Sequence, residues 1–252
     1  MINQAILEEL DNEFINSDML HLRDEWDHYK YKKLFVPRVT HIIHTCTLDT
    51  EALTKWANSL GYRHINSNYA REQAALTGTA IHNAIEDFLL NKSYPKFDTP
   101  MDEQMKQSIK NGIDGFISFW ENYRFKDLVA DVSLEQTLVT PYFGGTYDMI
   151  ITLTDGRKFL YDFKTSNNIR DSYFVQLAAY RFALLNYYNT KLDGVAILMI
   201  NKKTPSCKEY MLDLNIKEND DFMNLCERTF MSMLYTYYNC IAVKISFKEI
   251  IK

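Results

Sequence analysis

Two segments joined by a short polar turn constrain the fold of this chain most strongly. Residues 144–153 and 158–164 are rich in β-branched and aromatic side chains, as β-strands are. Thr154-Asp155-Gly156-Arg157 between them has the composition of a hairpin turn. Each strand carries an aspartate, Asp148 in the first and Asp162 in the second. The length of the loop decides whether these two carboxylates face each other.

Two loop lengths are compatible with this turn, and they place the aspartates differently. A two-residue loop would pair Asp148 with Phe163 and leave the aspartates on opposite faces of the sheet. A three-residue loop, with Gly156 in the left-handed conformation, pairs Asp148 directly with Asp162. The Cβ atoms of such neighbours are about 4.5–5.5 Å apart, so the two carboxylates would repel unless a cation lay between them. We therefore predict the three-residue loop and a divalent metal between the strands.

A lysine follows the second aspartate at a spacing that puts both side chains on one face of the strand. Asp162 and Lys164 are two residues apart, which separates them by about 6.5–7 Å along a strand. An anionic oxygen donor beside an ammonium group is the pair that a metal-dependent hydrolase needs at a phosphate ester. A surface salt bridge has the same pattern, so further motifs are needed to tell the two apart.

The composition is that of a globular chain with an uneven charge distribution. The chain has 252 residues, of which 46% are hydrophobic, and this supports a single domain with a packed core. The net charge is −5, but residues 155–208 hold nine Lys/Arg and four Asp/Glu, or +5, which leaves −10 for the remainder. A basic surface over an acidic metal pocket suits a polyanionic substrate, and an ordinary solvated charge mixture explains the same numbers.

Several classes of protein are disfavoured by the sequence. No apolar run approaches the roughly 18 residues of a membrane span. The first residues are acidic and lack a basic region, so we expect no signal or transit peptide and a cytoplasmic location, in a bacterium or an infected host cell. The cysteines lack C-x-x-C spacing and are expected to be reduced thiols. They are Cys46, Cys207, Cys226 and Cys240.

Hydrophobic periodicity and turn residues predict the remaining elements. Helices are expected over 3–17, 50–60 with Gly61 as the stop, 68–90, 102–122, 171–189 and 218–239, and a second short helix over 20–30. Strands are expected over 131–140, 144–153, 158–164, 195–200 and 208–214, and residues 33–47 are expected to be extended or irregular. The buried side of the last helix is expected to hold Phe222, Leu225, Phe230, Met233 and Leu234.

Four short motifs lie on these elements in a recognisable order. They are Gly78-Thr-Ala-Ile-His82, Gly145-Thr-Tyr-Asp148, Asp162-Phe-Lys164 and Gln176-Leu-Ala-Ala-Tyr180. This helix, three strands, helix and strand order resembles the PD-(D/E)XK nuclease superfamily, and within it the RecB-like exonuclease branch. The resemblance covers roughly residues 37–200. Residues 37–40 and the helix before Gly61 are also similar to the mitochondrial genome maintenance exonuclease and to phage exonucleases.

The resemblance implies an α/β (α+β) fold with a restriction-endonuclease-like core, in which helices flank a central mixed sheet. It implies one nuclease domain over 1–252. This domain would comprise a helical N-terminal extension (1–65), the nuclease core (66–215) and a C-terminal helix and tail (216–252). Any single motif of this kind occurs often by chance, whereas four in order are specific.

The same resemblance suggests roles for the residues of the motifs. Asp148 and Asp162 would bind Mg²⁺ or Mn²⁺ with the Phe163 carbonyl as a further ligand, and an imidazole from His82 would favour Mn²⁺. The metal would polarise the phosphoryl oxygen and lower the pKa of the attacking water. Lys164 would orient that water or stabilise the charge at phosphorus.

Other candidate residues have more than one reading. Glu135 shares a strand face with Ser133 and Thr137 by regular alternation, and it would bind a second metal, anchor the lysine, or face solvent. Gln176 and Tyr180 lie one helical turn apart and would hold a DNA strand or the active-site lysine, although Tyr180 is equally suited to the core.

Two further groups of residues concern the binding of nucleic acid and of an iron–sulfur cluster. Arg170 and Tyr173 near the site are candidates for stacking on the bases of a single strand. The cysteines after residue 200 are too widely spaced for an iron–sulfur cluster, so we expect none.

Together these features predict a metal-dependent deoxyribonuclease, acting as an exonuclease on single-stranded DNA or strand ends during replication, recombination or repair in a phage or bacterium. An RNA endonuclease with the same site is one alternative. A nucleic-acid-binding module with a decayed site is another. The acidic N-terminal helices would suit recruitment of replication or recombination partners. The sequence predicts no membrane association and leaves the oligomeric state open.

Overall fold

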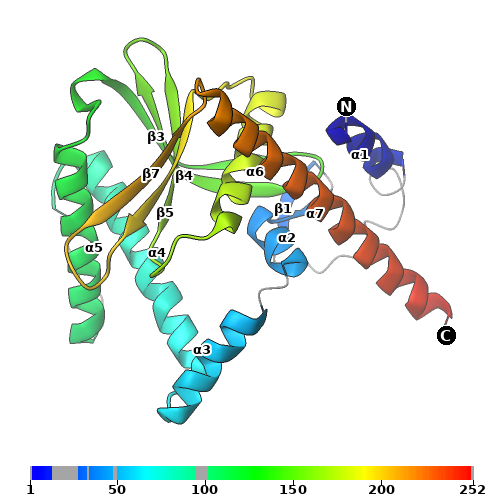
Figure 1. The fold of residues 1–252 in the computed structure, drawn as a ribbon, viewed down its shortest axis with the longest axis horizontal. Coiled ribbons are helices and arrows are strands. Elements are labelled where there is room, and N and C mark those ends of the chain that lie inside the picture. The colour runs from blue at the N-terminus through cyan, green and yellow to red at the C-terminus, as the bar shows by residue number, and fades with distance from the viewer. Residues whose placement is uncertain (1, 13–27, 33, 48–49, 95–101, 251–252) are drawn as a thin grey trace.

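A five-stranded mixed sheet forms the centre of the computed structural model, which describes residues 2–12, 28–32, 34–47, 50–94 and 102–250 (Figure 1). Its strands are β3 (Val129–Val139), β4 (Gly144–Leu153), β5 (Lys158–Lys164), β6 (Gly194–Ile200) and β7 (Cys207–Asp213), in that spatial order. Neighbouring strands are antiparallel except β5 and β6, which are parallel. The expected α/β class, with helices flanking a mixed sheet, is confirmed.

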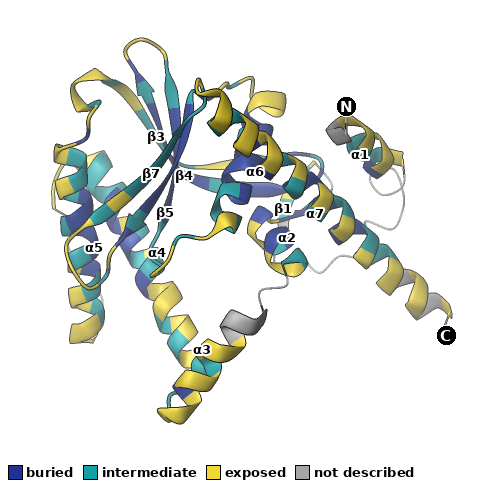
Figure 2. Cartoon of the chain, in the orientation of Figure 1, coloured by how far each residue is buried: buried dark blue, intermediate teal, exposed yellow. Residues whose placement is uncertain are grey.

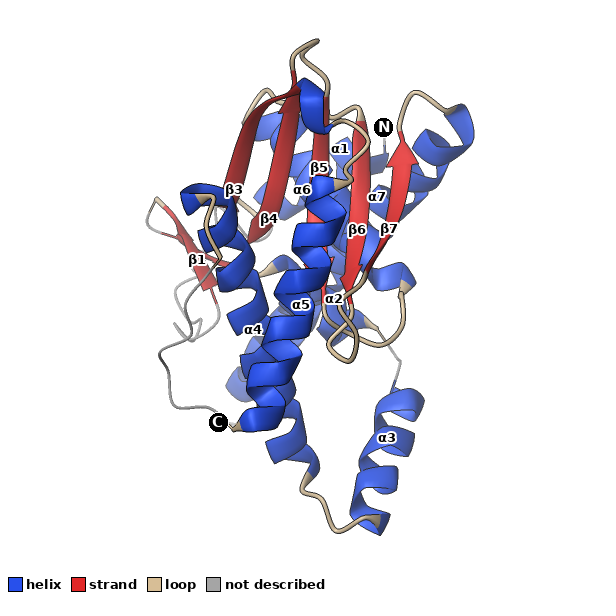
Figure 3. Ribbon diagram, turned by 90° about the vertical axis from the view of Figure 1, so that its left-hand side faces the viewer, coloured by secondary structure: helices blue, strands red, loops and turns tan. Residues whose placement is uncertain are grey.

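Helices cover both faces of this sheet (Figure 3). One face is covered by α4 (Ser67–Asn91) and α5 (Glu103–Glu121), and the other by α6 (Asp171–Tyr187) and α7 (Lys217–Ile250). The remaining described elements are α1 (Ile2–Leu10), β1 (His28–Tyr31), β2 (Leu34–Pro37), α2 (Val39–Cys46), α3 (Thr50–Tyr62) and the short 3-10 helix Lys126–Leu128. None of the helices in the described ranges combines the length and apolar character needed to span a membrane.

The β4–β5 hairpin has the three-residue loop that the sequence predicts. Gly156 is left-handed with φ +88°, and the backbone N–H of Leu153 donates to the Arg157 carbonyl at 2.9 Å. The strand register runs from Thr152 with Lys158 to Met149 with Tyr161, which is the register of a three-residue loop. Beyond this pair, the backbone N–H of Phe163 donates to the Asp148 side chain. The predicted loop is therefore confirmed, and the direct pairing of Asp148 with Asp162 stays a prediction.

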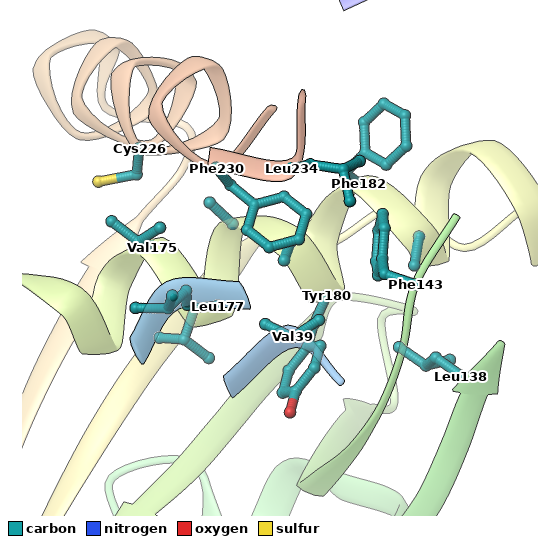
Figure 4. Close-up of a cluster of buried hydrophobic side chains, with 14 of the residues drawn as sticks. Val39, Leu138, Phe143, Val175, Leu177, Tyr180, Phe182, Cys226, Phe230 and Leu234 are labelled. Carbon is teal, nitrogen blue, oxygen red and sulfur yellow. The ribbon is translucent and has the colours of Figure 1, made fainter. Parts of the chain in front are cut away.

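The parallel pairing of β5 and β6 requires a crossover, and α6 supplies it. This helix is buried along most of its length because it lies between the sheet and α7 (Figure 2). Phe230 of α7 meets Phe143 with ring centroids 4.9 Å apart, and Leu234 lies one turn further along the same face (Figure 4). A helix held from both sides is a rigid support for side chains that point toward the sheet.

The opposite face of the sheet packs against two helices that approach each other closely. A side chain at Gly112 of α5 would come within 2.8 Å of Ile81 of α4, so glycine is needed for this contact. Ile81 and Ile85 are fully buried with Ile113 and Phe116 of α5. This packing orients the face of α4 that also carries His82.

The N-terminal region differs from the sequence-based expectation in two described places, and a third expectation falls largely outside the described residues. Helix α1 ends at Leu10, and the rest of the helix expected to reach residue 17 falls largely on 13–27, outside the described residues. The second helix expected over 20–30 is wrong at its end, because 28–31 is a strand paired with β2. Residues 39–46 form a helix rather than irregular chain, because it buries Val39, Ile42 and Ile43 on one side.

Two helix ends and one helix face also differ from expectation. Gly61 lies inside α3, which is followed by the left-handed His64 with φ +56°. Helix α7 continues to Ile250, beyond the expected end at 239. Phe222 and Leu225 of α7 are 39% and 51% exposed. Phe230 and Leu234 are buried as expected. The buried face is completed by Met223, Cys226, Met231, Tyr237 and Tyr238.

Candidate active site

Asp148 lies at the point where β4 passes β5 and contacts two other elements of the site. The backbone N–H of Phe163 on β5 donates a short hydrogen bond to Asp148 Oδ2. The other carboxylate oxygen, Oδ1, lies 3.3 Å from His82 Nδ1 on α4. One buried carboxylate therefore links the sheet to the helix that covers it.

Asp162 is 2% exposed and forms a closed network with a lysine and a glutamine. Lys164 Nζ lies 2.5 Å from Asp162 Oδ2 and donates to Gln176 Oε1 at 3.0 Å. Gln176 Nε2 in turn donates to Asp162 Oδ1 at 2.9 Å. Both polar ends of the glutamine amide are thus used to hold the ion pair, which leaves the ammonium little freedom.

Burial and neighbouring charge shift the pKa of both partners of this pair. Burial raises the pKa of Asp162 to about 6, the Lys164 charge opposes the rise, and the Asp148 charge adds to it. Burial lowers the pKa of Lys164, but the charges of Asp162 and Asp148 outweigh burial and raise it overall. Lys164 is consequently an ammonium group throughout the physiological range.

His82 titrates under the influence of the same carboxylates. Burial lowers the pKa of its imidazole, but the charge and hydrogen bond of Asp148 outweigh this effect and raise the pKa overall. In the neutral form, Nδ1 or Nε2 is available as a ligand to a cation. Gly78, one turn before His82, lets α4 approach the end of β5, because a side chain there would lie 3.1 Å from Thr165 Oγ1.

Glu135 interrupts the regular geometry of β3. Its φ is +46°, in the left-handed region that a glutamate rarely adopts. Leu134 packs into the core under α4 and α5, whereas Leu138 packs into the core under α6, although regular alternation would put both on one face. The expected alternation of Glu135 with Ser133 and Thr137 is therefore wrong, because the backbone turns over at this residue.

This turn brings a second carboxylate beside Asp148. Burial, and next the charge of Asp148, raise the pKa of Glu135 to about 7. One ligand atom each of His82, Glu135 and Asp148 lie within 4.8 Å of one another. They form a group that can hold a metal ion, with one nitrogen and two carboxylate donors.

Only some of the residues expected to bind the metal lie close together. His82 and Asp148 lie together as expected, and Glu135 joins them. Asp162 instead faces Lys164, and its Oδ2 is engaged by the Lys164 ammonium. The ligand roles predicted for Asp162 and for the Phe163 carbonyl stay predictions.

The residues predicted to bind nucleic acid divide into buried and exposed ones. Gln176 and Tyr180 are buried, and the Gln176 amide also donates to the Tyr180 hydroxyl at 3.0 Å. They support the lysine, one of the two roles expected for them. Tyr173 lies at the edge of the site, with Lys164 Nζ 5.0 Å from its ring centroid, and Arg170 before it is exposed.

A basic pocket beside the site was not predicted residue by residue. It has a volume of about 650 Å³ and lies between the loop after β5, from Thr165 to Ile169, and the β6–β7 hairpin. Lys202, Lys203 and Lys208 line it. The excess of basic residues over 155–208 is the signal in the sequence that pointed to this region.

The chain was compared with known proteins. No protein-family model and no curated protein matches it. Its fold is similar to the crystal structure of SSO0001, with 15% identity, a TM-score of 0.35, and coverage of 92% of this chain and 86% of that one. It is also similar to a phage related exonuclease from Haemophilus somnus 129PT, with 12% identity, a TM-score of 0.33, and coverage of 67% and 83%. Similarities this low carry no argument about function.

Proposed function

We propose that this protein is a metal-dependent nuclease that hydrolyses phosphodiester bonds of DNA, acting as an exonuclease on single strands or strand ends. One observation carries the proposal: two buried aspartates come from adjoining strands, and Lys164 pairs with Asp162 while His82 pairs with Asp148. A buried ion pair adds little to stability after its desolvation cost. Strongly shifted titratable groups gathered at one place are typical of functional sites.

The donors present fit a divalent cation. His82, Glu135 and Asp148 supply three ligand atoms in one group. Carboxylate oxygens suit Mg²⁺ and Mn²⁺, and the imidazole nitrogen favours Mn²⁺. A bound cation would neutralise charge on the phosphoryl oxygens and lower the pKa of a water molecule.

The protein's own residues would carry out the remaining tasks. Lys164, held by Gln176, presents a fixed positive charge to the oxygens of a phosphate, where charge increases in the transition state. Glu135, beside Asp148 and His82, would help to hold the cation. Tyr180 supports the amide of Gln176 from behind and takes no part in the chemistry.

A time course on end-labelled linear and circular single-stranded DNA with Mn²⁺ tests this proposal. We expect the linear strand to shorten from an end, the circular strand to resist, and EDTA to stop the reaction. A matched RNA strand in the same assay separates DNA from RNA cleavage. Cleavage of RNA alone, or binding of DNA without any Mn²⁺-dependent cleavage, would contradict the proposal.

The biological setting follows from this activity by inference. An enzyme that removes nucleotides from strand ends serves replication, recombination or repair, and we place it in the cytoplasm of a bacterium or of a cell infected by a phage. We also propose that the acidic N-terminal region binds replication or recombination proteins.

A further inference from the structure

The basic pocket beside the site is positive without any compensating acid in its lining. It is lined by Lys202, Lys203 and Lys208 together with serine, threonine and asparagine side chains, and none of its lining residues in the described ranges is a carboxylate. The chain as a whole carries a net charge of −5, so this pocket departs from its surroundings. Its volume of about 650 Å³ lies within the roughly 300–1,000 Å³ typical of ligand sites.

The pocket continues directly from the candidate active site across the sheet. Lys164 on β5 is in register with Met199 on β6, and Met199 is in register with Lys208 on β7. Residues in register on neighbouring strands point to the same face, so both lysines lie on the α6 side of the sheet. Two strand spacings of about 4.8 Å place their Cα atoms about 10 Å apart.

The three lysines of the pocket are not neutralised by the protein. Among the described residues, no carboxylate forms an ion pair with Lys202, Lys203 or Lys208, whereas Lys110 and Lys217 each pair with an aspartate on their own helix. Burial lowers the pKa of Lys202, since a partly buried ammonium without an anion loses hydration. An anionic ligand would compensate the Lys202 ammonium for the hydration that it has lost.

The hairpin that carries these lysines is held in place. A side chain at Gly115 of α5 would come within 2.6 Å of the Ser206 backbone nitrogen, so the hairpin and the helix are in close contact. Asn111 of α5 donates to the Lys202 carbonyl at 3.0 Å. Within the hairpin, the Asn201 side chain accepts from the Lys203 backbone N–H at 2.8 Å. A binding surface fixed in this way loses little conformational entropy when a ligand binds.

We propose that this pocket binds the backbone phosphates that flank the scissile phosphate of a single nucleic-acid strand, so that the strand crosses the sheet from β5 over β6 to the β6–β7 hairpin. The inference rests on the proposed function, because it takes Lys164 as the position of the reacting phosphate. The recognised chemistry is the phosphodiester backbone, which lysines contact without regard to base sequence.

Binding measured at several salt concentrations tests the proposal. The variant K202Q/K203Q/K208Q is compared with K126Q/K191Q/K217Q, which removes the same charge from exposed positions at the opposite end of the sheet. Fluorescence anisotropy of a fluorescein-labelled oligothymidine, in EDTA, reports the affinity. Three lost contacts at about 0.7 each should make the slope of log K against log salt about 2 smaller for the pocket variant only.

The outcomes separate this inference from the nuclease proposal. Equal slopes for the pocket variant and the control variant would refute the pocket as a phosphate site, even if the wild type cleaves DNA. A reduced slope for the pocket variant, with no Mn²⁺-dependent cleavage by the wild type, would refute the nuclease and leave the pocket as a strand-binding site. The variant K202R/K203R/K208R keeps the charges and should keep the wild-type slope.

A terminal phosphate is the other source of the same chemistry. Oligothymidines with a 5′-phosphate, a 3′-phosphate or hydroxyl ends distinguish the two. Equal binding of all three supports contacts with the internal backbone. A preference of the wild type for one phosphorylated end that K202Q/K203Q/K208Q loses would overturn the proposed path of the strand.

Discussion

Replacing Glu135 by glutamine should stabilise the metal-free protein at alkaline pH and change little at acid pH. Burial, and next the charge of Asp148, raise the pKa of the Glu135 carboxyl from its ordinary 4.5 to about 7. The folded protein thus keeps a proton that the unfolded chain has already released. This stabilising contribution is complete below pH 4.5 and is lost as the pH rises through about 7.

The expected size of the effect follows from the same pKa values. The difference between 4.5 and about 7 corresponds to about 3 kcal/mol, at about 1.36 kcal/mol for each pKa unit. The side chain is partly exposed, so solvent screening reduces the contribution to about 1–2 kcal/mol. The glutamine variant should therefore exceed the wild type in free energy of unfolding by about 1–2 kcal/mol at high pH.

Urea denaturation in EDTA, at a pH below 4.5 and at a pH above 7, measures this difference. Glu72→Gln on the exposed side of α4 is the control, and it should change the free energy of unfolding equally at both pH values. Addition of Mn²⁺ should reverse the order, because the wild type has one more carboxylate ligand. A glutamine variant that is less stable than the wild type in EDTA at high pH would refute the electrostatic reasoning.

Three further predictions concern catalysis, the metal and packing. Lys164→Ala should lower the cleavage rate by about 10²–10³-fold, and Asp162→Ala should abolish cleavage. Circular dichroism checks that both variants are folded. Wild-type turnover in either variant would contradict the assigned roles. His82→Ala should raise the Mn²⁺ concentration needed for activity, and an unchanged metal titration would remove the histidine from the metal site. Gly145→Ala should cost about 1–3 kcal/mol in urea denaturation, because the new methyl group would lie 2.4 Å from an α6 tyrosine ring. Gly61→Ala, which meets no atom within 4 Å, should be neutral or stabilising, and an equal loss in both variants would contradict the packing argument.

The β4–β5 hairpin could be predicted from the sequence because its geometry is local. Loop length and the left-handed Gly156 together determine the register of β4 with β5, in which Met149 pairs with Tyr161. The helices that carry His82 and Gln176 follow from local hydrophobic periodicity in the same way. Each of these predictions used residues close together in the sequence.

The features that could not be predicted depend on contacts between distant segments. Residues 39–46 contain β-branched side chains that favour strands, yet they form a helix because one face is buried by α6 and α7. The left-handed Glu135 has no glycine to signal it, and its conformation depends on packing on both faces of β3. The three lysines of the basic pocket come together only when the β6–β7 hairpin folds against α5.

The glycine that lets α4 approach β5 has a consequence for metal selectivity. Gly78 touches none of the candidate ligands, yet it sets the distance between the helix and the strand end next to them. A side chain too large for the Thr165 hydroxyl to accommodate would press α4 away from the end of β5 and would withdraw His82, the nitrogen donor of the group. A nuclease of this design would then prefer magnesium to manganese through a change at a position that never meets the ion.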